Sequence, residues 1–182
     1  MAAAAYDEEK LPPGQEPALD FVGTHSLPKS PYAFAAHVAV VEVSQENGTV
    51  KILKYIGVHD SGRIINPMLA EGQAQGAIAQ GIGQALWEGM EYSPEGQPLT
   101  GSLMDYALPK TTNMPDMDLD TIETLSELTP WGLKGIGELP TLAAPVAVAN
   151  AVMDALSQTG VRHIDTPLTT EKVWRALHGN NP

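Results

Sequence analysis

The stretch from Gly72 to Trp87 contains no charged residue, and Glu71 and Glu88 mark its limits. A helix on a protein surface normally carries a charged face opposite its apolar stripe. This stretch instead combines apolar residues, small residues and glutamines, so it predicts a helix that is covered on most of its sides. Asn66 followed by Pro67 predicts an N-cap and a first-turn proline for that helix.

Three glutamines of this predicted helix, Gln73, Gln80 and Gln84, fall within about 40° of one another at 100° per residue. Gly76 and Ala77 lie beside them. Amides offer paired hydrogen-bond donors and acceptors, and small neighbours allow close approach, so this stripe suits a heteroaromatic ligand with an amide-like edge. A buried helix that packs through its glycines, with the glutamines bonded to nearby backbone, explains the same pattern.

The pentapeptide Lys134-Gly135-Ile136-Gly137-Glu138 places one carboxylate between a glycine pair and the uncharged run 139–153. Glycines let a ligand or another backbone approach closely, and apolar surroundings make a carboxylate a stronger base. Glu138 is therefore a candidate general base. A glutamate that caps a helix or occupies a turn is the structural alternative.

The pattern of the other segments predicts an α+β fold with a mixed sheet, an N-terminal hairpin and packed helices. Asn47-Gly48 between two β-branched runs, 36–43 and 50–58, is a strong hairpin signal. The remaining predicted elements are a turn at 59–63, an acidic loop at 109–120, a strand at 121–125, a helix from Pro145 to about Leu156, and a helix at 171–177 capped by Thr169 or Thr170. We expect two parts: an extended arm, 1–31, and one domain, 32–182.

Composition excludes several classes of function. The 182 residues, 43% of them hydrophobic, suit one domain with a substantial core. A net charge of −12 argues against binding to nucleic acid or to an anionic membrane. There is no cysteine and the five histidines lack ligand spacing, so we expect no metal held by protein side chains. Since no targeting or membrane-spanning segment stands out, we expect a cytoplasmic protein.

Short motifs follow one another in a fixed order along the chain. They are Asn66-Pro67, Glu71-Gly72-Gln73, 80–86 (QGIGQAL), 101–106 (GSLMDY), 134–138 (KGIGE), Ala144-Pro145, 149–152 (ANAV), Pro167-Leu168-Thr169 and Val173-Trp174. Together they resemble the C-terminal part of the molybdenum hydroxylase large subunit, in the superfamily of xanthine dehydrogenase, aldehyde oxidase and aerobic carbon-monoxide dehydrogenase. The resemblance covers residues 18–178.

The resemblance implies a molybdopterin cofactor, in bacteria often the cytosine dinucleotide, with the molybdenum held by the pterin. Glu138 matches the family's catalytic base in the hydroxylation of an electron-poor carbon with oxygen from water. Gln73 matches a glutamine that bonds to the pyranopterin, and Gly135 and Gly137 match the close backbone approach to the metal centre. The helix residues that fit the family pattern, by contacting the cofactor or by packing its helix, are Gln80, Gly81 and Gln84.

The family's large subunits are several times longer than this chain. The resemblance therefore implies a piece of a split large subunit or an excised domain, inactive by itself. The implied partners are the rest of the large subunit, an iron–sulfur subunit with [2Fe–2S] and a flavin subunit with FAD; a homo-oligomer is a further option. The substrate stays open among purines, aldehydes, N-heterocycles and carbon monoxide.

Two other hypotheses remain. One is a non-catalytic remnant that keeps the fold and only packs against partners. The other is a small hydrolase with Glu138 as acid or base, for which the sequence offers no second carboxylate or nucleophile nearby.

Overall fold

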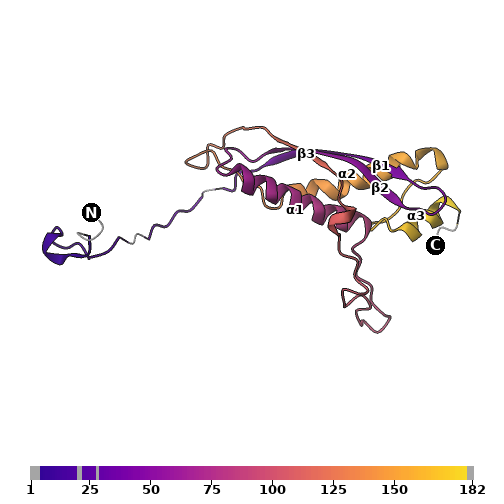
Figure 1. The fold of residues 1–182 in the computed structure, drawn as a ribbon, viewed down its shortest axis with the longest axis horizontal. Helices are drawn as coiled ribbons and strands as arrows, with labels where there is room; N and C mark the ends of the chain where they lie inside the picture. Colours follow the sequence, from indigo (N-terminus) through magenta and orange to yellow (C-terminus); the bar gives the residue numbers. More distant parts are fainter. Residues whose placement is uncertain (1–4, 20–21, 28, 180–182) are drawn as a thin grey trace.

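The computed structural model describes residues 5–19, 22–27 and 29–179. Its elements are η2 (Glu8–Lys10), β1 (Phe34–Val43), β2 (Val50–Asp60), α1 (Pro67–Leu86), η3 (Thr111–Asn113), β3 (Met117–Thr121), α2 (Leu139–Ala155), η4 (Ser157–Thr159) and α3 (Thr170–Leu177). The strands form one sheet in the order β1-β2-β3, antiparallel between β1 and β2 and parallel between β2 and β3. Figure 1 shows this sheet as one layer, with α1 and α2 packed together as a second layer beneath it. The predicted α+β class with a mixed sheet and an N-terminal hairpin is confirmed.

The hairpin forms around Asn47 and Gly48, as predicted, with Val43 paired to Val50. The prediction of a turn at 59–63 is wrong at its start, because β2 continues to Asp60. The strand continues because β1 pairs with it as far as Asp60, and β3 as far as His59. As a result His59 and Asp60 are buried strand residues.

The core lies between the sheet and the two long helices. Its fully buried side chains are Tyr55, Ile78, Ile82, Ala85, Leu86, Ala144, Val148, Val152, Leu156, Leu168 and Val173. The predicted start of the second helix at Pro145 is wrong, since α2 begins at Leu139 and contains Pro145. A proline inside a helix costs about 3 kcal/mol through its missing N–H and its ring. Burial of the α2 face that carries Ala144 and Val148 offsets this cost.

The short elements differ in how well the sequence predicts them. α3 begins after Thr169, whose side chain accepts from the Lys172 N–H at 3.3 Å, as predicted. The strand predicted at 121–125 is wrong, because β3 occupies 117–121 within the expected acidic loop. Its acidic side chains, Asp118 and Asp120, are exposed and alternate with inward-facing apolar ones, which is the period of a strand.

Two segments extend away from the layers in Figure 1. The described residues before β1 form an extended arm that contains the short 3₁₀ helix η2. Residues 88–110 form a projecting loop, closed by a bridge between Tyr92 and Pro98. Met104 in this loop is 96% exposed. In the described ranges no helix combines the length and the apolar character needed to cross a membrane.

Candidate functional site

The loop at 131–138, which carries the predicted base, is fixed to the end of β2 by its backbone. The Lys134 N–H donates to the Ser61 carbonyl at 2.9 Å. Gly62 and Gly132 have φ angles of +64° and +74°, and a Cβ on Gly62 would overlap the Gly132 carbonyl. Only glycine tolerates that conformation and that contact together. The loop therefore starts from a defined position.

Side chains fix the same loop through a buried ion pair. Lys134 Nζ lies 3.0 Å from Asp60 Oδ2 and 2.6 Å from Thr124 Oγ1, and the Lys134 and Asp60 side chains are only 7% and 4% exposed. Asp60 also accepts from the Gly62 N–H at 3.0 Å, the Thr124 N–H at 3.2 Å and the Thr124 hydroxyl. Burial alone raises the pKa of Asp60, but the hydrogen bonds from Thr124, Gly62 and Lys134 outweigh it and hold this pKa well below its usual range.

Glu138 lies at the other end of the loop and is the N-cap residue of α2. Its side chain makes no capping hydrogen bond, so the capping alternative does not explain this glutamate. Its backbone carbonyl accepts from the Leu142 N–H at 3.3 Å, which joins it to the first turn of α2. The side chain is exposed, so this chain does not supply the apolar surroundings expected from the sequence. The carboxylate is free to face a ligand or another chain.

The structure brings Gln73 to the same place. A Cβ built on Gly137 would lie 3.7 Å from Nε2 of Gln73, so this amide of α1 reaches the loop that carries Glu138. Gln73 is exposed. Gln73 and Gly137, which are distant in the sequence, thus lie side by side.

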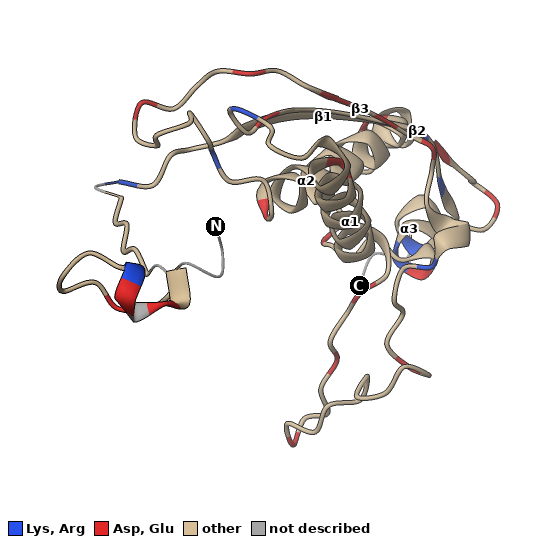
Figure 2. Ribbon diagram, turned by 60° about the vertical axis from the view of Figure 1, so that its left-hand side comes forward, with Lys and Arg blue, Asp and Glu red and all other residues tan. Residues whose placement is uncertain are grey.

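The glycines near Gln73 and Glu138 in the sequence have open space beside them. A Cβ built on Gly72, Gly76 or Gly135 would meet no atom within 4 Å. We name this the glycine surface: Gly72, Gln73 and Gly76 of α1 together with Gly135, Gly137 and Glu138 of the loop. Figure 2 shows α1 and α2 almost without charged residues, in contrast to the strands and loops. The glycine surface therefore offers close approach and neutral hydrogen-bonding groups to a flat ligand.

The other predicted residues of α1 divide between packing and exposure. A Cβ on Gly81 would lie 2.6 Å from Ala144 Cβ and 2.8 Å from Pro145 Cδ, so Gly81 lets α1 and α2 approach closely. Packing is one of the two roles that the sequence left open for Gly81. Gln80 is exposed, and among the described residues its amide has no hydrogen-bond partner.

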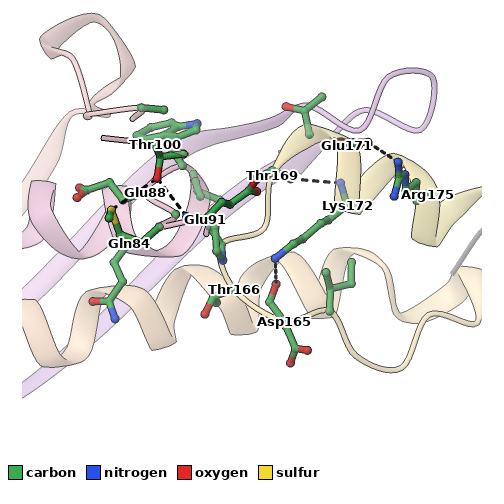
Figure 3. A pocket seen from close by; sticks show the side chains of 18 of the residues that line it. Gln84, Glu88, Glu91, Thr100, Asp165, Thr166, Thr169, Glu171, Lys172 and Arg175 are labelled. Atoms are coloured by element: carbon green, nitrogen blue, oxygen red, sulfur yellow. Dashed lines mark hydrogen bonds and ion pairs between the residues drawn. The ribbon is translucent and has the colours of Figure 1, made fainter. Parts of the chain in front are cut away.

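Gln84 lies in a different place from Gln73. It lines an open hollow of about 1260 Å³ formed with the loop after α1 and with α3 (Figure 3). Lys172 and Arg175 on the α3 side of this hollow are already engaged, Lys172 Nζ with the Asp165 carbonyl at 3.3 Å and Arg175 with Glu171. The structure therefore does not join Gln84 to the glycine surface.

A buried polar group under the sheet has no counterpart in the sequence predictions. His37 Nδ1 lies 2.7 Å from the Tyr55 hydroxyl, and His37 Nε2 lies 2.8 Å from Nε2 of His59. Burial, and then the neighbouring His59, lowers the pKa of His37 to about 4. Burial also lowers the pKa of His59 and raises that of Tyr55. Both histidines are neutral at pH 7, so the group connects β1 and β2 without buried charge.

The main residues that sequence reasoning missed are Asp60 and Thr124. The available signal was a lysine next to the glycines of this loop, since a buried ammonium requires a carboxylate partner. The partner is not identifiable from spacing. Within the described part of the chain, no group of three or more His, Cys, Asp or Glu side chains is placed to hold a metal ion.

Comparisons with known proteins identify the family of this chain. The family model of the molybdopterin cofactor-binding domain matches residues 1–115. The chain is 41% identical to the nicotine 6-hydroxylase large subunit of Paenarthrobacter nicotinovorans, over 98% of this chain and 22% of that protein. It is 34% identical to the carbon monoxide dehydrogenase large chain of Hydrogenophaga pseudoflava, over 100% of this chain and 23% of that protein.

A solved structure is also similar to this chain. Quinoline 2-oxidoreductase from Pseudomonas putida 86 superposes with a TM-score of 0.87 at 38% identity, over 99% of this chain and 23% of that one. The chain thus spans less than a quarter of the length of these relatives. It belongs to the molybdopterin cofactor-binding domain family.

Proposed function

We propose that this chain is the cofactor-binding and base-supplying part of a molybdenum-dependent oxidoreductase, which hydroxylates an electron-poor carbon with oxygen from water. The observation that carries the proposal is the meeting of Gln73 with the loop of Glu138 on the glycine surface. A carboxylate at a helix start, beside an amide and open glycines, is suited to bind a flat polar ligand and to accept a proton next to it.

The residues of the glycine surface fit a molybdopterin. The open space over Gly72, Gly76 and Gly135 admits a planar ring system against backbone. The exposed amide of Gln73 offers a donor and an acceptor to the amide-like edge of a pterin. When bound, the cofactor supplies the redox chemistry that no side chain of this protein provides.

Each residue then has a separate task. Gln73 orients the pterin through its amide. Gly135 and Gly137 keep the loop backbone close to the bound group. Glu138 accepts, at a carboxylate oxygen, the proton that water loses as its oxygen is transferred to the substrate. The exposed carboxylate takes its apolar surroundings from the substrate and from the protein that closes the site.

The proposal includes the finer features implied by the family. They are the cytosine dinucleotide form of the cofactor, [2Fe–2S] and FAD on partner chains, the rest of a large subunit, a cytoplasmic location, and a boundary between the arm (1–31) and the domain (32–182). Support comes from the length of the relatives, and from the words "large subunit" and "large chain" in their names. An assembly of several chains accounts for the greater length of the relatives and for their names as large subunits or large chains.

The sequence identities to the relatives also favour one substrate class over the others. Nicotine and quinoline are nitrogen heterocycles, and the relatives named for them share 41% and 38% of aligned residues with the chain. The carbon monoxide dehydrogenase large chain shares 34%. We therefore propose a nitrogen heterocycle as the substrate class, hydroxylated at a carbon next to an electron-withdrawing ring nitrogen.

Replacement of Glu138 by Gln tests the proposal in the full assembly. General-base catalysis contributes about 10²–10⁴-fold, so we expect kcat to fall by at least about 100-fold with unchanged molybdenum content. Glu127→Gln, at an exposed glutamate outside the glycine surface, is the matched control and should leave kcat unchanged. Full activity of Glu138→Gln with normal metal content would refute the proposal and favour the non-catalytic remnant.

A further inference from the structure

The ion pair between Lys134 and Asp60 is unusual because both charges are removed from water. Burial of two charges costs several kcal/mol each, and a buried pair often stabilises a fold no more than apolar residues of similar size do. The pair nevertheless lies in a hydrogen-bonded network, with Thr124 bonded to both partners. A group of this kind needs an explanation beyond core stability.

The pair joins three segments at one point. Asp60 ends β2, Thr124 follows β3, and Lys134 lies in the loop of the candidate base, four residues before Glu138. Nζ of Lys134 also lies 5.1 Å from the ring centroid of Phe34, at the start of β1. The ammonium is therefore held from several directions, and its loop cannot slide along the sheet without breaking these contacts.

The far end of the loop is fixed as well. Pro140 is buried, and the Thr141 hydroxyl donates to the Ala77 carbonyl of α1 at 3.2 Å. Only the segment 135–137, with its two glycines, lies between Lys134 and Glu138. Glycines leave a backbone free to adopt many conformations. The position of the Glu138 carboxylate therefore depends on both fixed ends.

We propose that Asp60, Thr124 and Lys134 are positioning residues that hold Glu138 at the glycine surface. This inference rests on the proposed function, because it assigns the three residues a task in the same reaction. None of the three belongs to the glycine surface; they act through the backbone of the loop, in which Lys134 is joined to Gly135. If Lys134 loses its partner, residues 135–137 gain freedom and the carboxylate leaves its working position.

The experiment compares single variants of the full assembly. Lys134→Met removes the ammonium and Asp60→Asn removes the carboxylate charge. Lys54→Met removes an exposed ion pair of the same sheet, Lys54 to Asp118 at 2.7 Å, and serves as control. The readouts are kcat, KM, molybdenum content, and hydrogen exchange of the amides at 135–138.

We expect kcat of Lys134→Met and Asp60→Asn to fall by about 100-fold, because a displacement of about 1 Å has that effect. KM and molybdenum content should stay within about twofold, since the substrate and cofactor contacts are intact. Exchange at 135–138 should become faster, and Lys54→Met should change nothing. Lys134→Arg, which keeps the charge, should restore part of kcat.

Two additional variants keep the test decisive. If Lys134→Met fails to fold, Thr124→Val removes only the shared hydroxyl, and kcat should fall by about tenfold. The double variant Lys134→Met/Glu138→Gln should be no slower than Glu138→Gln alone, because both changes then act on one group.

Unchanged exchange at 135–138, or kcat losses that only follow the amount of folded enzyme, would overturn the positioning role. Full activity of Glu138→Gln overturns the proposed function instead, and the exchange data still report whether the pair holds the loop.

Discussion

Two glycines of α1 have opposite surroundings, and alanine substitutions should separate them. A Cβ on Gly81 would press against Ala144 and Pro145, whereas a Cβ on Gly76 would meet no atom within 4 Å. We expect Gly81→Ala to lower the free energy of unfolding by about 1–3 kcal/mol. Gly76→Ala should raise it by up to about 1 kcal/mol through helix propensity. Urea denaturation of the two variants measures the free energy of unfolding. An equal change of this free energy in both variants would show that α1 and α2 do not pack through Gly81.

At the residue scale, the sequence identified the groups that carry a chemical signal of their own. Glu138 and Gln73 stand out among neutral and small neighbours, and the structure brings their segments together. Asp60 and Thr124 were missed because an aspartate at the end of a strand and a threonine in a loop are ordinary residues. Their role arises only when the fold places them against Lys134.

At the element scale, the β1–β2 hairpin should make the fold sensitive to mild acid. The pKa of His37 is about 4 in the folded chain and ordinarily 6.5, so the unfolded chain binds the proton more readily. The free energy of unfolding should therefore have its highest value above pH 6.5 and fall by about 1–3 kcal/mol as the pH drops to 4. The shift of the His59 pKa acts in the same direction.

Urea denaturation at several pH values checks this. His37→Gln should show a smaller decrease, and His163→Gln, at an exposed histidine, should behave like the parent chain. A stability that is constant between pH 6.5 and 4 would contradict the buried neutral pair.

The sequence predicted the elements better where a local signal dominates. The turn at Asn47-Gly48, the cap at Asn66 and the cap at Thr169 each act within a few residues, and each is confirmed. The predicted start of α2 and the predicted position of β3 were wrong, because packing between elements determines both. Apolar burial carries α2 through Pro145, and pairing with β2 selects residues 117–121 as the strand.

At the scale of the whole molecule, the exposed apolar side chains predict an assembly. Phe34 and Val38 on the outer face of β1, Leu142 and Val146 on α2, and Met104 in the projecting loop are all more than half exposed. Apolar surfaces of this kind mark contacts with other chains or segments. In the proposed function the rest of a large subunit covers them.

Purification of the chain from its native source tests this expectation. We expect a large complex that contains about one molybdenum per copy of the chain, together with iron and flavin. Mass measurement and metal analysis of the purified material decide the question. A small metal-free species would contradict the assembly and leave an isolated domain.

The two fixed ends of the loop from Lys134 to Leu139 also limit how this protein can be redesigned. Each residue of extended chain spans about 3.5 Å, so one inserted or deleted residue at 135–137 would move Glu138 by more than the length of a hydrogen bond. The number of residues in the loop is therefore less tolerant of change than their identity.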